Sequence, residues 1–365
     1  MGIPQVIMIL VALFLTYLAI VKKYEPLLLL PLAFGMLIAN IPLAELSAYD
    51  QGGLIYYLYK GIEMGIYPPM IFLCIGAMTD FGPLIASPKS ALIGLGGQLG
   101  IFAALGGALL LGGVIPGIEP FSLKEAATIG MIGSSDGPTS IYTAGVLAPH
   151  LLPVITIAAY SYMALVPLIQ PPIVRALTTK KERVIVMSSP KRVTRRQKIL
   201  FTLGITIATL IFVPKAGTLI SMLMLGNLIR ESGVAERYVR TLQNHLLNIL
   251  TLLIGVSIGA TATADRILNP GTILIICLGL LAFAFGTVGG VLIAKLLCKI
   301  TRGKVNPLIG NSGVSAMPMA ARVSQTLGQE YNPQNHLLMH AMGPIVASTI
   351  GSALIAGLFI NYFGL

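Results

Sequence analysis

One short stretch of this chain combines the residue types that bind and release a small cation. Residues 132–140 read Ile-Gly-Ser-Ser-Asp-Gly-Pro-Thr-Ser, and apolar sequence long enough to span a bilayer lies on both sides. An ionisable side chain at membrane depth is costly and usually marks a functional site. Gly137 and Pro138 interrupt a helix, so freed carbonyls, hydroxyls and the Asp136 carboxylate together form a hard oxygen-ligand set. The alternative is a structural Asp136 that caps a half-helix through Thr139.

A second stretch has a related composition. Residues 309–315 read Ile-Gly-Asn-Ser-Gly-Val-Ser and resemble residues 132–138, with Pro318 and Arg322 following. Paired broken segments at corresponding positions of two halves are typical of a transport site, although chance similarity between Gly- and Ser-rich segments is the alternative. The permanent charge of Arg322 either reaches the membrane surface or faces the cavity. In the cavity it would repel a second cation or bind a carboxylate.

The composition indicates a polytopic helical membrane protein that positions these two stretches. Of 365 residues, 55% are hydrophobic and 10% charged, and the mean hydropathy is +0.87. No water-soluble domain of this size has such a composition. The first apolar run is kept as a span and not as a signal peptide, because Lys22 and Lys23 follow it. The expected spans are 4–20, 27–44, 67–86, 91–113, 150–174, 199–214, 216–230, 241–263, 270–297 and 335–361.

Loop charges predict how these spans are oriented. Loops 21–26, 175–198, 231–240 and 298–304 are basic and should face the cytoplasm. A basic run such as 180–198 also suits nucleic acid, but in a membrane protein it is far more typical of topology, so no nucleic-acid partner is expected. With this orientation, segment 122–147 is a hairpin that enters from the outer side and returns. Segment 304–326 enters from the cytoplasmic side.

The two halves of the chain are therefore predicted to contain the same order of membrane segments, each with one broken segment. We expect residues 1–178 to form a first membrane repeat with broken segment 122–147. Residues 179–198 form a basic cytoplasmic loop, and residues 199–365 form a second repeat with broken segment 304–326. The predicted fold is an all-α polytopic membrane protein of about ten spans plus two broken or re-entrant segments, arranged as two inverted repeats.

Cysteines and histidines give no sign of another metal site. Cys74, Cys277 and Cys298 lack CxxC spacing and predict neither a disulfide framework nor a metal site. His336 and His340 are four residues apart, but the glutamate of an HExxH motif and a third ligand are missing. These histidines are better interpreted as core or gating residues.

Three motifs together resemble the beta subunit of the sodium-pumping, biotin-dependent decarboxylases. The first is Gly-Ser-Ser-Asp-Gly-Pro-Thr at 133–139. The second is Asn-Pro-Leu-Ile-Gly at 306–310, running into Gly-Val-Ser at 313–315 and Pro-Met-Ala-Ala-Arg-Val at 318–323. The third is His-Ala-Met-Gly-Pro at 340–344. The resemblance covers nearly the whole chain, and the family acts on oxaloacetate, methylmalonyl-CoA, glutaconyl-CoA or related acids.

The resemblance implies a division of work between subunits. A carboxyltransferase (alpha) subunit moves the carboxyl group of the substrate to biotin on a carrier protein. The membrane subunit then decarboxylates the carboxybiotin, consumes an external proton and exports Na⁺. A small single-span gamma or delta subunit, a homo-oligomeric arrangement and the prokaryotic cytoplasmic (inner) membrane are also implied. This chain has no Met-Lys-Met biotinylation site, so biotin is expected on another chain.

The resemblance also assigns roles to individual positions. Asp136 would be the central Na⁺ and proton site, with Asn306, Gly310 and Ser315 belonging to the ion path. Tyr162 would deliver protons, and Arg322 would pair with Ser315 or hold the carboxybiotin. One position departs from the family pattern: Ile345 follows Gly-Pro where the family has Asn, which suggests one Na⁺ fewer or Ser348 as a substitute ligand.

Two rival functions fit parts of the pattern. A stand-alone Na⁺/H⁺ antiporter or a Na⁺-coupled carboxylate transporter would also use inverted repeats and an aspartate at the midplane. A passive membrane anchor for soluble enzymes is disfavoured, because an anchor has no use for Asp136 and Arg322 at membrane depth.

Overall fold

The computed structural model describes residues 2–23, 26–42, 46–49, 51–189, 191–317 and 319–364, and within them every regular element is a helix. Pro318 of the second broken segment lies outside the described residues. Five segments among those described are long and apolar enough to cross a membrane: Ile3–Ile20, Pro88–Leu111, Glu236–Gly259, Pro270–Ile300 and Leu338–Phe363. Two bent helix pairs raise the number to seven if each is one span. The all-α membrane prediction is therefore confirmed.

Some expected spans consist of shorter or broken helices. Span 27–44 is α2 (Pro26–Ala39), and span 67–86 divides into α4 (Tyr67–Met78) and α5 (Gly82–Ala86). Span 91–113 divides at Gln98 into α6 (Ala91–Gly97) and α7 (Leu99–Leu111). Because helices such as α2 and α4 are too short to cross a bilayer straight on their own, the total of about ten spans stays a prediction.

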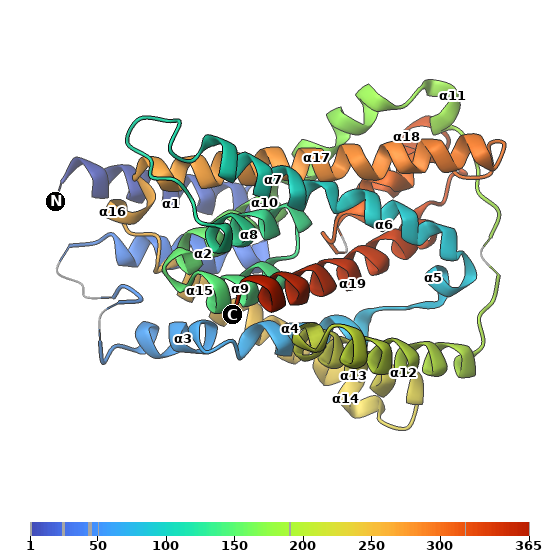
Figure 1. Ribbon diagram of the computed structural model, residues 1–365, viewed down its shortest axis with the longest axis horizontal. Coiled ribbons are helices and arrows are strands. Elements are labelled where there is room, and N and C mark those ends of the chain that lie inside the picture. Colours follow the sequence, from blue (N-terminus) through green and yellow to red (C-terminus); the bar gives the residue numbers. More distant parts are fainter. Residues whose placement is uncertain are drawn as a thin grey trace.

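The remaining helices complete the chain (Figure 1). In the first half they are α1 (Ile3–Ile20), α3 (Leu54–Glu63), η1 (Pro88–Ser90), α8 (Leu123–Met131), η2 (Ile132–Ser134), α9 (Gly137–Leu147), η3 (Pro149–Leu151), α10 (Leu152–Leu177) and α11 (Lys180–Arg183). In the second half they are α12 (Arg195–Phe212), η4 (Pro214–Ala216), α13 (Gly217–Ser232), α14 (Glu236–Arg240), η5 (Thr241–Leu246), α15 (Leu247–Gly259), α16 (Ala264–Ile267), α17 (Pro270–Ile300), η6 (Pro307–Gly313), α18 (Met319–Tyr331) and α19 (Leu338–Phe363).

Two helix pairs of the fold are closely packed. Helix α2 packs along α15, and α4 packs along α13. A Cβ on Gly259 would lie 2.0 Å from the Leu32 carbonyl oxygen, and a Cβ on Gly76 would lie 1.9 Å from that of Leu223, so both contacts require glycine. A buried asparagine forms a hydrogen bond across each pair. Asn40 donates to the Ala262 carbonyl at 2.7 Å, and Asn227 donates to the Thr79 carbonyl at 2.7 Å.

The first broken segment is a hairpin that begins and ends on the same side. Ser122 and Glu125 form a capping box that starts α8, and the chain reverses between η2 and α9. After α9, His150 Nε2 lies 2.7 Å from Glu125 Oε1, so the end of the segment returns to its beginning. That this hairpin enters and leaves a membrane on its outer side, as predicted for 122–147, stays a prediction.

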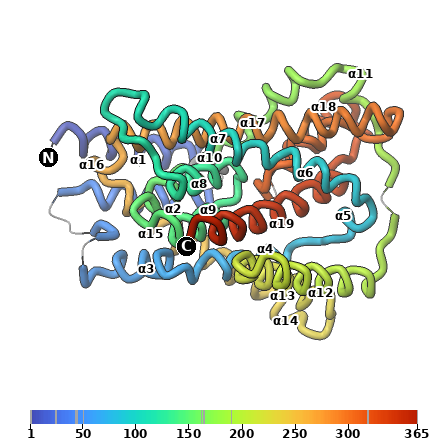
Figure 2. The backbone as a smooth tube through the Cα atoms, viewed as in Figure 1, coloured from blue at the N-terminus to red at the C-terminus, as the bar shows by residue number. Residues whose placement is uncertain are grey.

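The second broken segment returns in the same manner at the opposite end of the molecule. Asn306, before η6, and Asn335, after α18, both donate to the Arg183 carbonyl oxygen, at 3.2 Å and 3.0 Å. Figure 2 shows the first hairpin towards the side that carries the N-terminus and α18 towards the side that carries α11. The long helix α17 contacts both broken segments and runs along most of the molecule (Figure 1).

Candidate functional site

Asp136 lies at the reversal of the first hairpin, between two short helices. Ser135 adopts a left-handed conformation (φ 57°, ψ 31°), which a residue other than glycine rarely does and which turns the chain sharply after η2. Asp136 is then the N-cap of α9, and its Oδ1 accepts a hydrogen bond from the Thr139 N–H at 3.4 Å. The capping interpretation of Asp136 is thus correct for one carboxylate oxygen.

The second carboxylate oxygen of Asp136 faces another helix. Ser352 Oγ, on α19, donates to Asp136 Oδ2 at 2.9 Å. Asp136 is only 4% exposed, and it forms no ion pair within the described part of the chain. A buried carboxylate without a charged partner is strongly unfavourable, and the N-terminus of α9 compensates only part of its charge. The site is therefore built to receive a cation or a proton.

Unpartnered oxygens surround this carboxylate. Eight buried side-chain oxygens have no hydrogen-bond partner among the described residues, and those of Ser135, Thr139, Tyr160 and Gln98 are four of them. Ser135 and Thr139 belong to the turn that holds Asp136. Tyr160 packs against this turn, since a Cβ on Gly137 would lie 2.8 Å from its ring. Buried hydroxyl and amide oxygens without protein partners leave lone pairs for an ion or a water molecule at this place.

Polar groups of α19, both side-chain hydroxyls and a backbone carbonyl, lie between the carboxylate and the second broken segment. Ser352 Oγ lies 3.0 Å from the Thr349 carbonyl, and Ser315 Oγ donates to Thr349 Oγ1 at 3.3 Å and to Ser348 Oγ at 3.2 Å. Gln98, at the break between α6 and α7, donates to Ser348 Oγ at 2.9 Å. Asp136 and Ser315 are therefore connected through the serines and threonine of α19.

The two broken segments also touch through their backbones. The N–H of Ser315 donates to the Ser134 carbonyl at 3.1 Å. Glycines of α6 and α7 make room for this contact: a Cβ on Gly97 would lie 1.8 Å from the Gly313 carbonyl oxygen, and one on Gly133 would lie 2.4 Å from that of Gly100. The sequence interpretation of two interrupted segments that share one site therefore has the required proximity.

Asn306 and Gly310 lie away from Asp136, at the start of the second broken segment. The side chain of Asn306 is fully buried and bonded, donating to the carbonyls of Arg183 and Ile185 and accepting from the Leu308 N–H. A Cβ on Gly310 would lie 2.5 Å from Val291 Cα, so Gly310 is a packing contact with α17.

Tyr162 and Arg322 form neither a hydrogen bond nor an ion pair with the carboxylate in the described structure. The Tyr162 hydroxyl donates to the Ile276 carbonyl of α17. Arg322 is exposed and lines a cavity of about 510 Å³ that it shares with Arg175 and Glu330. No hydrogen bond joins Arg322 to Ser315 among the described residues, where Ser315 bonds to α19 instead.

Sequence reasoning missed the contribution of α19 and of Gln98. It gave no role to Ser352, Thr349 or Gln98, and it treated Ser348 only as a substitute ligand. A usable pattern was present, because Ser348 and Ser352 are four residues apart within an apolar helix and therefore share one face.

The donor set suits an alkali cation better than a transition metal. It consists of one carboxylate, hydroxyls and an amide, all of them hard oxygen ligands. Within the described ranges, no three His, Cys, Asp or Glu side chains lie close enough together to hold a metal ion. All three cysteines are free. Na⁺ fits the residues present.

Comparisons with known proteins point in the same direction. Residues 4–363 match the family model described as "Na+-transporting oxaloacetate decarboxylase beta subunit". The methylmalonyl-CoA decarboxylase subunit beta of Veillonella parvula is 55% identical over 96% of this chain and 91% of its own length. The glutaconyl-CoA decarboxylase subunit beta of Acidaminococcus fermentans is 52% identical over 98% of this chain and 93% of its own length. The oxaloacetate decarboxylase beta chain of Klebsiella pneumoniae is 48% identical over 99% of this chain and 96% of its own length.

Proposed function

Because this chain belongs to the family of Na⁺-transporting oxaloacetate decarboxylase beta subunits, we propose that it couples the decarboxylation of carboxybiotin to the export of Na⁺ and the uptake of an external proton. It is a membrane subunit of a Na⁺-translocating decarboxylase complex. A stand-alone antiporter or carboxylate transporter is disfavoured, because the named relatives are decarboxylase subunits over nearly their whole length.

The observation that carries the proposal is the buried, unpaired carboxylate of Asp136 among unpartnered oxygens. A Na⁺ ion there neutralises the carboxylate and accepts the free lone pairs of Ser135 and Thr139 as ligands. When Na⁺ leaves, a proton takes its place, since an empty ionised carboxylate at this depth is costly. Na⁺ and the proton therefore compete for Asp136, and each weakens the binding of the other.

Exchange at Asp136 requires access that alternates between the two sides of the membrane. In the described conformation Asp136 and Ser352 are 4% and 0% exposed, so the site is closed. Carboxybiotin supplies the driving reaction, in which loss of CO₂ leaves a ring nitrogen that takes up one proton. Asp136 holds the proton that enters from outside, and Na⁺ leaves as that proton binds. Na⁺ from the cytoplasm then displaces the proton towards the reaction.

The other predicted residues take supporting roles in this proposal. Ser315 links the second hairpin to α19 beside the carboxylate and would form part of the ion path. Asn306 and Gly310 hold the start of that hairpin in place. Tyr162 stays the predicted proton-delivery residue, for which its hydroxyl must first release the Ile276 carbonyl. Arg322 stays a predicted partner of an anionic group.

Reciprocal contacts support an arrangement of two inverted repeats, with repeats 1–178 and 199–365 joined by the basic loop 179–198. The second span of each half packs on the third span of the other, as α2 with α15 and α13 with α4. Asn40 and Asn227 occupy equivalent places in these pairs. The final helix of each half, α10 or α19, contacts the broken segments of both halves.

Contacts between basic loops support the predicted orientation in the bacterial inner membrane. Lys23 and Arg175 line the same cavity as Arg322. Lys295, near the end of α17, lies 3.8 Å from Glu182 of the basic loop. Clustering of the basic loops at one end is what the positive-inside rule predicts for the cytoplasmic face.

Partner subunits complete the proposed complex. The carboxyltransferase (alpha) subunit and a biotin carrier protein would generate carboxybiotin, and a small single-span gamma or delta subunit would join this chain, in a homo-oligomeric complex. The beta-subunit names of the relatives support an assembly of several chains.

The test is the exchange Asp136→Asn in the purified complex. Asn keeps the size of the side chain and removes its charge, so the variant should assemble yet lose Na⁺-dependent decarboxylation. Asp265→Asn, which neutralises an exposed aspartate in the first turn of α16, is the matched control and should behave as wild type. Wild-type Na⁺ dependence in Asp136→Asn contradicts the proposal.

A further inference from the structure

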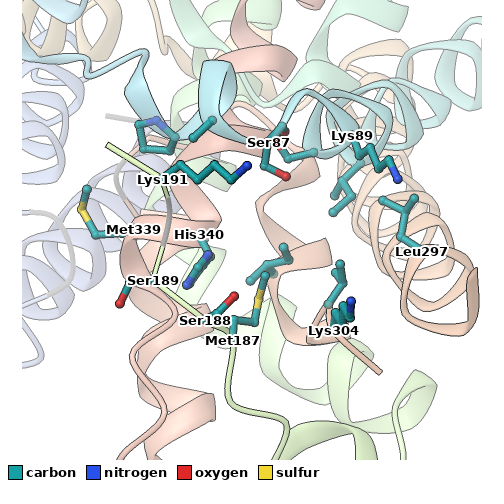
Figure 3. Close-up of a pocket in the computed structure, with 16 residues that line it drawn as sticks. Ser87, Lys89, Met187, Ser188, Ser189, Lys191, Leu297, Lys304, Met339 and His340 are labelled. Atoms are coloured by element: carbon teal, nitrogen blue, oxygen red, sulfur yellow. Dashed lines mark hydrogen bonds between the residues drawn. The ribbon is translucent and has the colours of Figure 1, made fainter. Parts of the chain in front are cut away.

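A basic cavity lies between the loops at the end of the molecule where Arg183 joins the second hairpin. It measures about 250 Å³ and is lined by residues of segments 83–90, 187–189 and 304–309, by Lys191 and by α6, α17 and α19. Lys89, Lys191 and Lys304 come from three separate segments, and His340 comes from α19 (Figure 3). We call this cavity the lysine vestibule.

The charge of the lysine vestibule is unbalanced. Its lining includes three lysines and no aspartate or glutamate. None of the three lysine side chains forms a hydrogen bond or an ion pair in the described part of the chain. Three lysines outside the vestibule do pair with an acid: Lys60, Lys198 and Lys295. Three unpaired cations around one concave site favour an anionic ligand.

The floor of the lysine vestibule leads towards the polar chain around Ser315. Ile93 and Ile309 line the vestibule, and the Ile93 carbonyl oxygen is 2.6 Å from where a Cβ on Gly313 would be. His340 precedes Ser348 by eight residues on α19, which is about 12 Å along a helix. An anion in this cavity is therefore separated from the Ser315–Ser348 contact by only a few residues of α6 and α19.

The remaining lining suits a small ring with polar edges. The lining includes the apolar side chains of Met187, Leu297 and Val305 and three serines, Ser87, Ser188 and Ser189. A few polar groups on an apolar wall are the usual composition of a small-molecule site. The cavity that contains Arg322 differs, because it also contains Glu330, which lies 2.7 Å from Arg175.

We propose that the lysine vestibule binds the carboxylated ureido ring of carboxybiotin, with the positive charges of Lys89, Lys191 and Lys304 attracting its carboxylate and the apolar lining residues contacting its second ring. This assignment rests on the proposed function for its ligand. It places the anion in a cavity different from that of Arg322.

The test is binding without turnover. The full chain, purified in detergent, is mixed in Na⁺-free buffer with the biotin carrier protein of the complex, either free of carboxyl or loaded with a ¹⁴C-labelled carboxyl group. Without Na⁺ the label is not released, so retention measures binding alone. Wild type should retain the carboxylated carrier about tenfold more tightly than the free carrier, and salt should reduce the difference by screening.

Variants then locate the site. The triple exchange Lys89→Gln, Lys191→Gln and Lys304→Gln should remove the preference for the carboxylated carrier, and the corresponding triple exchange to Arg should keep it. Lys299→Gln, an exposed lysine near the end of α17 that does not line the vestibule, is the matched control. Wild-type preference in the triple Gln variant, loss of preference in Arg322→Gln alone, or no preference in wild type overturns the assignment.

The same samples separate this inference from the proposed function. When Na⁺ is added, Asp136→Asn should retain the labelled carrier but fail to release its label. Release at the wild-type rate from Asp136→Asn contradicts the proposed function, whatever the lysine variants do. Normal binding by the triple Gln variant together with an inactive Asp136→Asn rejects the assignment of carboxybiotin to the lysine vestibule and leaves the proposed function in place.

Discussion

The backbone N–H of Ser315 donates a hydrogen bond to the backbone carbonyl of Ser134 at 3.1 Å, although the two residues belong to hairpins that enter from opposite ends of the molecule. This contact sets the Asp136 turn beside the second hairpin. A movement of one hairpin tip must therefore disturb the other, which gives the site a physical route for coupling its two sides.

Close packing at the hairpin tips predicts the effect of a single methyl group. A Cβ on Gly97 would lie 1.8 Å from the Gly313 carbonyl oxygen, whereas one on Gly106 has no neighbour within 4 Å. Gly97→Ala should therefore lower the unfolding free energy by about 1–3 kcal/mol and abolish Na⁺ transport. Gly106→Ala, the control, should be neutral or slightly stabilising. Equal melting temperatures of the two variants in detergent contradict the described contact.

Ser352 is predicted to set Na⁺ affinity. Its hydroxyl bonds Asp136 Oδ2 at 2.9 Å, and its loss leaves that oxygen with one partner fewer. Ser352→Ala should raise the half-saturating Na⁺ concentration for decarboxylation about five- to thirtyfold, equivalent to about 1–2 kcal/mol. Ser257→Ala is the matched control, because the Ser257 hydroxyl bonds only the Leu253 carbonyl of its own helix. An equal effect of both exchanges argues against a role for Ser352 at the site.

Cysteine labelling tests the hairpin geometry. In a background that lacks Cys74, Cys277 and Cys298, His150→Cys should react with a membrane-impermeant maleimide added outside whole cells. Lys304→Cys should react only after the membrane is opened. The reason is that the first hairpin begins and ends at the Glu125–His150 contact, and the second at the Arg183 carbonyl. Labelling of both positions from the same side rejects the inverted arrangement.

The ion pair between Asp80 and Lys198 predicts a dependence of stability on pH. Burial alone would raise the pKa of Asp80, but the hydrogen bond and charge of Lys198 and the Gly82 N–H outweigh it and hold that pKa below its usual value. The pair therefore stabilises the fold above the ordinary aspartate pKa of about 4, and this contribution is lost as pH falls further.

Asp80→Asn isolates this charge. At pH 7 the variant should unfold at a lower temperature than wild type, with a difference of about 0.5–1 kcal/mol because the pair is partly exposed. The difference should shrink as the pH is lowered towards 3. A constant difference across that range contradicts the assigned cause.

The sequence is most informative where a residue type conflicts with its surroundings. Asp136, Gly137 and Pro138 are costly within apolar sequence, so their position alone identifies the broken segment and its carboxylate. The pairing of 132–138 with 309–315 predicts that two segments share a site, and the Ser134–Ser315 hydrogen bond has that geometry.

Tertiary packing determines what the sequence does not disclose. Ser352 and Thr349 are ordinary residues of a membrane helix, and only the crossing of α19 over the Asp136 turn makes them neighbours of the carboxylate. The motif around Asn306 predicts a place in the ion path, but the amide of Asn306 is used by the carbonyls of Arg183 and Ile185. A motif predicts that a residue type is needed at a position, but it does not predict which groups that side chain contacts.

The most direct measurement of the central claim is Na⁺ binding to the purified chain as a function of pH. With ²²Na⁺ and equilibrium dialysis, the half-saturating Na⁺ concentration should rise as the pH falls, approaching about tenfold per pH unit where one proton competes with one ion. Asp136→Asn should bind no Na⁺ at the concentrations that saturate wild type. Na⁺ affinity that is independent of pH, or Na⁺ binding by Asp136→Asn as tight as in wild type, contradicts the account.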